Sequence, residues 1–274
     1  MIRIIASYDE CRGFAAGFSD DPNFSDPMLT NEEQVRGNLE KSFDKPDRYD
    51  ILGVFQDGRM VGLFNFLVLR DERYIEMIVG LSREENAYRE VLLYLEENYP
   101  SYNVDFVFNP RNHLLTKLLQ EKGADFEPEQ LKMVWKPSRL DVDTTGVELF
   151  SEPYAGQYFA IHNQDMYWTG EKVAAAPERF RTLLAVHEGA VVGYIDVTHC
   201  FEENEPYDLF VLEQYRRMGY GRKLLAKALE MNCPRDMMLL VDIDNAPAIH
   251  LYESMGFERH EKQNNVTVHW TVPA

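Results

Sequence analysis

The hydrophobic and polar positions of this chain follow one pattern twice. Residues 57–62 (DGRMVG) place a tight turn between two apolar runs, and residues 188–193 (EGAVVG) do the same 131 positions later. Apolar runs on both sides of a glycine-containing turn predict a β-hairpin. After each hairpin the pattern predicts a strand, a helix, a strand and a helix. These elements fall at 74–80, 88–98, 104–108 and 112–123 in the first copy, and at 207–212, 220–232, 237–243 and 245–256 in the second.

Each copy then ends on a strand that contains a tryptophan and is soon followed by a proline. The pairs are Trp135 with Pro137 and Trp270 with Pro273. A repeat of this length is too long for a solenoid unit, so it predicts two copies of a whole α/β domain. The polar, turn-rich segment 137–146 is typical of a linker. We therefore predict one domain over 1–136 and a second over 147–274.

The last predicted helix carries its own boundary signals. Asn245 is a suitable N-cap, and Pro247 falls in the first turn, where its missing amide hydrogen costs little. Gly256 suits the left-handed residue that commonly follows a helix. The sequence therefore predicts a helix that begins after Asn245 and ends before Gly256.

Composition narrows the class of protein. The 274 residues are 45% hydrophobic and 27% charged, which indicates a folded protein large enough for two domains. Only three cysteines occur, and the chain has neither a signal-peptide pattern at its start nor an apolar run long enough to cross a membrane. We therefore expect a cytoplasmic protein without a membrane partner, as a monomer or a homodimer.

The formal net charge of −18 disfavours nucleic acid as a partner, because a phosphate backbone is repelled by it. Cationic small molecules or basic peptides are favoured instead, although solubility explains the charge equally well.

One stretch runs against this acidity. Residues 214–225 (QYRRMGYGRKLL) bring cations and glycines together at the start of a predicted helix. The first amides of a helix have no partner inside it and carry the positive end of its dipole, so they suit an anion. Gly219 and Gly221 let the backbone bend and a phosphate approach, while Arg216, Arg217 and Arg222 add charge. Basic residues at a helix start are also often only solvated.

Two motifs together resemble the GNAT superfamily of N-acetyltransferases. Arg216, Gly219 and Gly221 fill the first, and the second is filled by Asn245, Tyr252, Gly256 and Phe257. The resemblance runs from about Thr182 to the C-terminus and is specific only in its combination. It implies a mixed α/β fold with two tandem GNAT-like domains, each a mostly antiparallel central sheet with flanking helices.

The resemblance also implies acetyl-CoA as co-substrate and no metal. Its pyrophosphate would lie on the turn, and its pantetheine arm along the preceding strand. The residues implied for the pyrophosphate are Arg216, Arg217, Met218, Gly219, Tyr220, Gly221, Arg222 and Asn245. Those implied for the pantetheine arm are Leu209, Phe210 and Val211. The implied reaction is direct attack of a primary amine, on a small molecule or a peptide, on the thioester. The rival hypothesis is a non-catalytic acyl-CoA-binding or regulatory protein.

Two catalytic residues are candidates. Tyr252 matches the family tyrosine that protonates the departing thiolate, and a phenol with a pKa near 10 is protonated at neutral pH. An ordinary half-buried core tyrosine is the alternative. For the base we favour Glu205, because strand alternation would put it on the face of Leu209 and Val211. Asp208, Glu213 and a chain of water molecules remain alternatives for the base.

Two cysteines and four aromatic residues are further candidates for a functional role. Cys200 and Cys233 lack a Cys/His/Asn arrangement and are interpreted as plain thiols. Four aromatic residues precede the second hairpin, where the family binds its acceptor, and core packing explains them equally well. They are Tyr154, Tyr158, Tyr167 and Trp168.

The first copy has lost the turn. Alignment of residues 84–93 with 216–225 puts Glu84 at Arg216, Ala87 at Gly219 and Arg89 at Gly221, and Leu119 takes the tyrosine position. Carboxylates at 84 and 85 repel a phosphate, so we predict a degenerate N-terminal domain.

Overall fold

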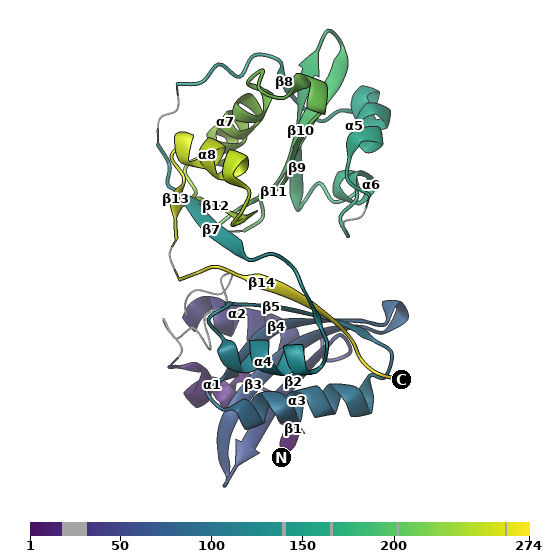
Figure 1. Cartoon of the computed structure of the whole chain (residues 1–274), viewed down its shortest axis with the longest axis vertical. Helices are drawn as coiled ribbons and strands as arrows, with labels where there is room; N and C mark the ends of the chain where they lie inside the picture. Colours follow the sequence, from purple (N-terminus) through teal and green to yellow (C-terminus); the bar gives the residue numbers. More distant parts are fainter. Residues whose placement is uncertain (18–31, 139–140, 165–166, 202, 261) are drawn as a thin grey trace. The chain divides into compact units, whose positions relative to one another are not determined.

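The chain folds as two compact α/β units (Figure 1). The structure is a computed structural model, and it describes residues 1–17, 32–138, 141–164, 167–201, 203–260 and 262–274. Unit 1 comprises Met1–Leu131 with Glu261–Ala274, and unit 2 comprises Lys132–His260. Both combine β-sheets with flanking helices, which confirms the predicted α/β class.

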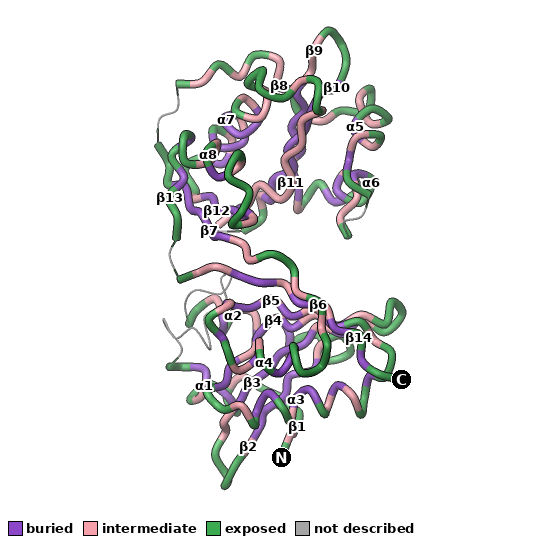
Figure 2. Tube along the Cα trace, viewed as in Figure 1, coloured by how far each residue is buried: buried purple, intermediate pink, exposed green. Residues whose placement is uncertain are grey.

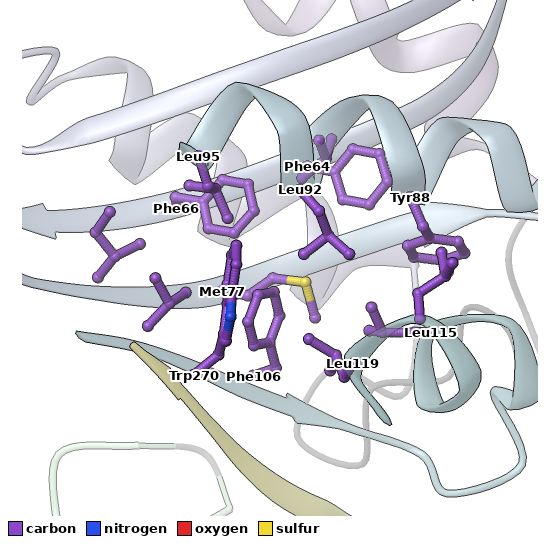
Figure 3. Close-up of a cluster of buried hydrophobic side chains, with 14 of the residues drawn as sticks. Phe64, Phe66, Met77, Tyr88, Leu92, Leu95, Phe106, Leu115, Leu119 and Trp270 are labelled. Carbon is purple, nitrogen blue, oxygen red and sulfur yellow. The ribbon is translucent and has the colours of Figure 1, made fainter. Parts of the chain in front are cut away.

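Unit 1 is built on a seven-stranded sheet in the order β1-β2-β3-β4-β5-β14-β6. All of its pairings are antiparallel except that of β4 with β5. Its elements are β1 (Ile2–Ile4), α1 (Tyr8–Ala15), α2 (Glu32–Phe43), β2 (Tyr49–Gln56), β3 (Arg59–Leu69), β4 (Tyr74–Ser82), α3 (Glu85–Asn98), β5 (Asn103–Phe108), α4 (His113–Glu121), β6 (Asp125–Phe126) and β14 (Val266–Thr271). Its largest core cluster joins α3 and α4 to the sheet around Phe64, Tyr88, Phe106 and Trp270 (Figure 3).

Unit 2 divides its strands between two sheets, in the orders β11-β10-β9-β8 and β12-β7-β13. Its elements are β7 (Gln130–Trp135), β8 (Val147–Leu149), α5 (Ala155–Ile161), α6 (Gly170–Ala174), β9 (Phe180–His187), β10 (Ala190–Thr198), β11 (Pro206–Val211), α7 (Tyr220–Asn232), β12 (Met237–Asp242), α8 (Ala246–Ser254) and β13 (Glu258–Arg259). Strand, two helices, three strands, helix, strand, helix and strand follow one another in both units.

Both predicted hairpins are present, as β2–β3 and β9–β10. The predicted ends of the last helix are also confirmed. The Asn245 side chain accepts a hydrogen bond from the Ala248 amide at 3.2 Å, and Gly256 adopts a left-handed φ of 89°. Buried positions follow the strands and the inner faces of the helices (Figure 2). Within the described residues, no helix has the length and apolar content to cross a membrane.

The two closing strands are exchanged, which differs from the predicted ranges 1–136 and 147–274. β14, at the end of the chain, completes the sheet of unit 1 between β5 and β6, whereas β7 lies between β12 and β13 in unit 2 (Figure 1). Trp270 packs against Phe106 with ring centroids 6.5 Å apart, and Trp135 is fully buried in unit 2. Two strands with the same apolar pattern present equivalent faces, so the pattern does not determine which sheet each one joins.

The predicted linker, 137–146, falls within unit 2. Residues 139–140 lie outside the described residues. Beyond them, the Asp143 carboxylate accepts a hydrogen bond from Lys223 Nζ on α7 at 2.9 Å.

Candidate functional site

The two sheets of unit 2 separate at β11 and β12. The segment just before β11 meets the start of β12 at a parallel bridge between Asn204 and Met237, where the Met238 amide donates to the Asn204 carbonyl at 2.9 Å. Beyond it, β11 is an edge of one sheet and β12 an edge of the other. The side of Leu209, Phe210 and Val211 that is turned away from β10 therefore has no strand partner among the described residues. Backbone groups in such a position are available to a ligand.

A tight bend leads from the end of β11 into α7. A 3-10 turn over Glu213–Tyr215 comes first, and then Arg217 (φ 62°) and Gly219 (φ 89°) both take left-handed conformations. Gly219 is the N-cap of α7 and offers no side chain to its amides. The first helical bond runs from the Lys223 amide to the Gly219 carbonyl at 3.0 Å. The amides of residues 220–222 therefore point out of the helix without an intrahelical partner.

The cations of the turn have different partners. Arg216 Nε donates to the Val211 carbonyl at 3.1 Å, and Arg222 donates to Ser254 Oγ at 2.6 Å. Lys223 is held by Asp143. Arg217 is exposed and makes no hydrogen bond or ion pair with any described residue. Two arginines thus brace the end of β11 and the end of α8, and Arg217 remains for an anion.

Gly221 has no packing reason to be a glycine. A Cβ placed there would lie 3.6 Å from Leu251 Cδ2 and 4.0 Å from Val211 Cγ2, which are ordinary contacts. Its backbone is not left-handed. The small residue therefore leaves space at the helix start that the protein itself does not fill.

Tyr252 lies on α8 with its ring 5.7 Å from that of Phe257. Burial, with the nearby charge of Asp208, raises the pKa of Tyr252 to about 12. Its hydroxyl makes no hydrogen bond with a described residue. The side chain is therefore a protonated donor at neutral pH whose hydrogen is uncommitted. The Asn245 carboxamide oxygen, in contrast, is committed to capping the helix.

The expected alternation of β11 fails at a bulge. Pro206 lies opposite Val197 and Asp208 lies opposite Asp196, so Tyr207 is an extra residue. Because of it, Glu205 does not share the face of Leu209 and Val211 as predicted.

The three candidate carboxylates have different surroundings. Glu205 lies near the positive charges of Arg179 and Lys132, and burial raises its pKa. Glu213 is exposed at the start of the 3-10 turn. Asp208 is the carboxylate whose charge reaches Tyr252.

A buried polar network that the sequence analysis missed lies behind β11. The Asp196 carboxylate accepts hydrogen bonds from Tyr158 (2.9 Å), Thr182 (2.5 Å) and His162 Nε2 (3.0 Å). The Tyr194 hydroxyl donates to Asp208 at 2.6 Å. A carboxylate inside the apolar run VVGYIDVT was the signal that could have revealed it, because a charge in such a strand needs buried partners.

Single donor atoms of His162, Asp196 and Asp208 lie within 4.8 Å of one another, a spacing that could suit a cation. His162 is not free to act as a ligand, however, since its Nδ1 faces the Asn163 carbonyl at 2.9 Å and its Nε2 faces Asp196. A ring nitrogen that donates a hydrogen has no lone pair to offer a metal.

Comparison with known proteins agrees with this geometry. Residues 147–257 match the model of the Acetyltransferase (GNAT) family. The chain therefore carries a GNAT-family domain. An "N-alpha-acetyltransferase" from Sulfurisphaera tokodaii is 32% identical over 87 residues, which cover 26% of this chain and about half (52%) of that protein.

Solved GNAT structures share the fold of the whole chain. A GCN5-related N-acetyltransferase from Sphaerobacter thermophilus matches 100% of this chain and 96% of its own, with a TM-score of 0.67 and 15% identity. A tandem GNAT protein from the clavulanic acid biosynthesis pathway matches 100% and 99%, with a TM-score of 0.60 and 15% identity. At this identity the likeness concerns the fold alone.

The four aromatic residues that precede the hairpin of the GNAT domain differ in exposure. Tyr158 is fully buried, and Tyr154 packs against its cluster. Trp168 is half-buried against Phe180, whereas Tyr167 is 55% exposed beneath Lys172 Nζ. Core packing accounts for the first two, so Trp168 and Tyr167 are the ones that remain available to line an acceptor site.

In unit 1, protein groups occupy the position that corresponds to the turn. Ser82 Oγ accepts the Glu84 amide at 2.9 Å just before α3. Glu85 then forms ion pairs with Arg89 at 2.7 Å and with Lys117 at 3.1 Å. A carboxylate paired with two cations therefore lies at the position that corresponds to Arg217 of unit 2, and the degenerate role of unit 1 stays a prediction.

Proposed function

We propose that unit 2 transfers an acetyl group from acetyl-CoA to a primary amine. The observation that carries this proposal is the open turn at the end of β11. Outward-facing amides, a glycine without a packing role and Arg217, which has no partner among the described residues, converge there. The GNAT family match supports acetyl transfer in general, and the N-alpha-acetyltransferase relative supports an amine as the acceptor.

The pyrophosphate would bind the amides of residues 220–222 together with Arg217, since a helix start stabilises an anion. The pantetheine arm would pair with the outer backbone edge of Leu209–Val211, in the manner of an added strand, and would share the Val211 carbonyl with Arg216 Nε. The thioester would then lie near Tyr252 on α8.

The chemistry is a direct displacement. The amine nitrogen attacks the thioester carbonyl, the C–N bond forms, and the C–S bond breaks to release a thiolate. Tyr252 donates its hydroxyl proton to that sulfur, because burial and the charge of Asp208 keep the phenol protonated. Donors at the end of β11 would stabilise the oxyanion.

Acetyl-CoA binding tests the turn. Gly221→Glu should lower the affinity, measured by titration calorimetry, about a hundredfold or more, which corresponds to about 2.7 kcal/mol. The added carboxylate would project into the space proposed for the phosphates and repel them. Gly156→Glu is the matched control. Gly156 is also the second residue of a helix in unit 2, it is exposed, and a Cβ at this position would meet no atom within 4 Å. Equal affinities for both variants would contradict the assignment.

A non-catalytic acyl-CoA-binding protein has the same turn and differs in turnover. Acetyl-CoA incubated with a panel of amines should release free thiol only when a suitable amine is present. Tight binding of acetyl-CoA without thiol release on any amine would favour the non-catalytic alternative.

A further inference from the structure

Two carboxylates and a histidine form one network on the face of β10 and β11 that α5 covers. Asp196 and Asp208 are direct cross-strand partners, so their side chains point to the same face. His162 follows the last residue of α5, and its ring stacks on Tyr194 with centroids 4.8 Å apart. Asp196 and His162 are 0% and 4% exposed, whereas Asp208 is only partly buried.

We propose that Asp208 binds the ammonium group of the acceptor and takes its proton, and that His162 and Asp196 form a buried positioning pair behind it. This inference rests on the proposed acetyl transfer and names the residues that recognise the acceptor.

Hydrogen bonding identifies the charge of His162. Its two ring nitrogens face a backbone carbonyl and a carboxylate, both of which only accept, so both nitrogens carry a hydrogen. Burial by itself lowers the pKa of His162, but the hydrogen bonds to Asp196 and to the Asn163 carbonyl outweigh it and raise the pKa. Its position at the C-terminal end of a helix also favours a cation.

The charges of the network do not cancel. One imidazolium faces two carboxylates, which leaves one negative charge uncompensated. Asp196 has its oxygens occupied by Tyr158, Thr182 and His162, so the excess charge resides on the more exposed Asp208. A partly buried, uncompensated carboxylate attracts a cation, and the acceptor of the proposed reaction is an ammonium ion.

Asp208 also acts on the proposed acid through its charge. That charge helps to raise the pKa of the Tyr252 phenol, so the group that would take a proton favours the protonated form of the group that would give one. Glu205, the base favoured from the sequence, instead lies near the positive charges of Arg179 and Lys132, which favour its charged form over the protonated one.

Protons balance in this scheme. The ammonium ion gives one proton to Asp208, which passes it to solvent, and the neutral amine attacks the thioester. As the C–S bond breaks, Tyr252 gives its proton to the thiolate. The nitrogen of the tetrahedral adduct loses a second proton, which restores the phenol of Tyr252. One ammonium ion and acetyl-CoA thus yield the amide, the free thiol and one proton.

The first test is the rate of thiol release from acetyl-CoA with benzylamine, spermidine and a tripeptide that has a free α-amino group. Asp208→Asn should lower kcat/KM about a hundredfold or more on any amine that the wild-type protein accepts. Calorimetric affinity for acetyl-CoA should stay within about threefold, because Asp208 is not part of the phosphate turn.

The second test is the dependence of kcat/KM on pH. The fall of kcat/KM at low pH, its acid limb, should report protonation of Asp208. The groups that face this carboxylate are Tyr194 and Asp196 on β10, His162 after α5, Tyr252 on α8 and Tyr207 on its own strand. Burial raises the pKa of Asp208, while the Tyr194 hydrogen bond and the His162 charge lower it. His162→Gln and Tyr194→Phe each remove a lowering influence, so each should move the acid limb to higher pH.

His269→Gln is the control for the pH profile. This histidine also lies between two carboxylates, Asp105 at 2.6 Å and Glu127 at 3.0 Å, but it belongs to unit 1. Its replacement should leave the acid limb in place.

A measurement without turnover completes the design. The His162 ring should show both nitrogens protonated at neutral pH in NMR spectra of the whole protein, and Asp208→Asn should lower its titration midpoint by removing a nearby negative charge. A midpoint unchanged by Asp208→Asn, or a neutral ring, overturns the positioning pair.

Failure of this inference can be distinguished from failure of the proposed function. An active wild-type protein whose Asp208→Asn variant keeps its rate, or whose acid limb disappears only with Glu205→Gln, overturns the role of Asp208 alone. A wild-type protein that binds no acetyl-CoA, or acetylates no amine, overturns both.

Discussion

At the scale of single residues, environment rather than residue type gives Tyr252 its suitability as an acid. A phenol exposed to water has a pKa near 10. Burial in unit 2 and the negative charge of Asp208 both disfavour the phenolate, so the pKa of Tyr252 rises to about 12. The same two influences leave the hydroxyl available as a donor across the whole neutral range.

Tyr252→Phe should therefore depress kcat about a hundredfold while the affinity for acetyl-CoA remains close to that of the wild-type protein. The phenyl ring keeps its packing on Phe257, and only the donated hydrogen is lost. Steady-state kinetics combined with calorimetry separate the two effects. Tyr94→Phe in unit 1 removes a hydroxyl that donates to Asp50 at 2.9 Å, and it controls for the loss of a phenol away from the proposed site. Equal kcat values for Tyr252→Phe and the wild-type protein would make Tyr252 a packing residue.

The sequence predicted the turn and the helix cap because both depend on residues that are close together in the chain. Gly219 adopts its left-handed conformation and Asn245 caps its helix through local contacts. His162 and Asp196 were missed because 34 residues separate them, and only the packing of α5 on β10 brings them to 3.0 Å. Glu205 was placed on the wrong face because a bulge at Tyr207 has no reliable signal in the alternation of apolar residues.

At the scale of elements, two glycines of unit 2 serve different purposes. A Cβ on Gly193 of β10 would lie 2.6 Å from the Phe210 carbonyl oxygen on β11, a contact with backbone that cannot be relieved without moving the strand. Gly221 on α7 meets only side-chain atoms at ordinary distances. Gly193 therefore allows β10 and β11 to pair, whereas Gly221 keeps the helix start open.

Gly193→Ala should consequently destabilise the protein by about 1–3 kcal/mol and weaken acetyl-CoA binding, because β11 carries the proposed pantetheine edge. Gly221→Ala should be neutral or stabilising by up to about 1 kcal/mol, since alanine favours a helix. Urea denaturation measures the change in stability of each variant, and calorimetry measures its affinity for acetyl-CoA. Equal losses of stability for the two variants would contradict this division of roles.

At the scale of the whole molecule, the exchange of β7 and β14 makes each unit depend on residues from the other half of the sequence. β14 reaches Phe126 on β6 and residues 103–108 on β5, and it buries Trp270 in the core of unit 1. β7 pairs with β13 and brings the fully buried Trp135 and Lys132 into unit 2, where Lys132 Nζ meets Glu203 at 3.1 Å. The boundaries of the compact units therefore differ from those of the two sequence repeats.

This exchange can be tested by two fragments of similar length. Residues 128–260 contain all of β7 and the rest of unit 2, and they should unfold cooperatively and bind acetyl-CoA. Residues 147–274, the range that the repeat alone would suggest, lack β7 and carry β14 without its sheet. Loss of a buried tryptophan strand removes at least the roughly 1.5–3 kcal/mol expected for one large apolar side chain, and it leaves the sheet edges of β12 and β13 unpaired. Near-UV circular dichroism and thermal denaturation should show a packed state only for the first fragment. A second fragment that folds and binds acetyl-CoA as well as the first would show that the exchanged strand is dispensable.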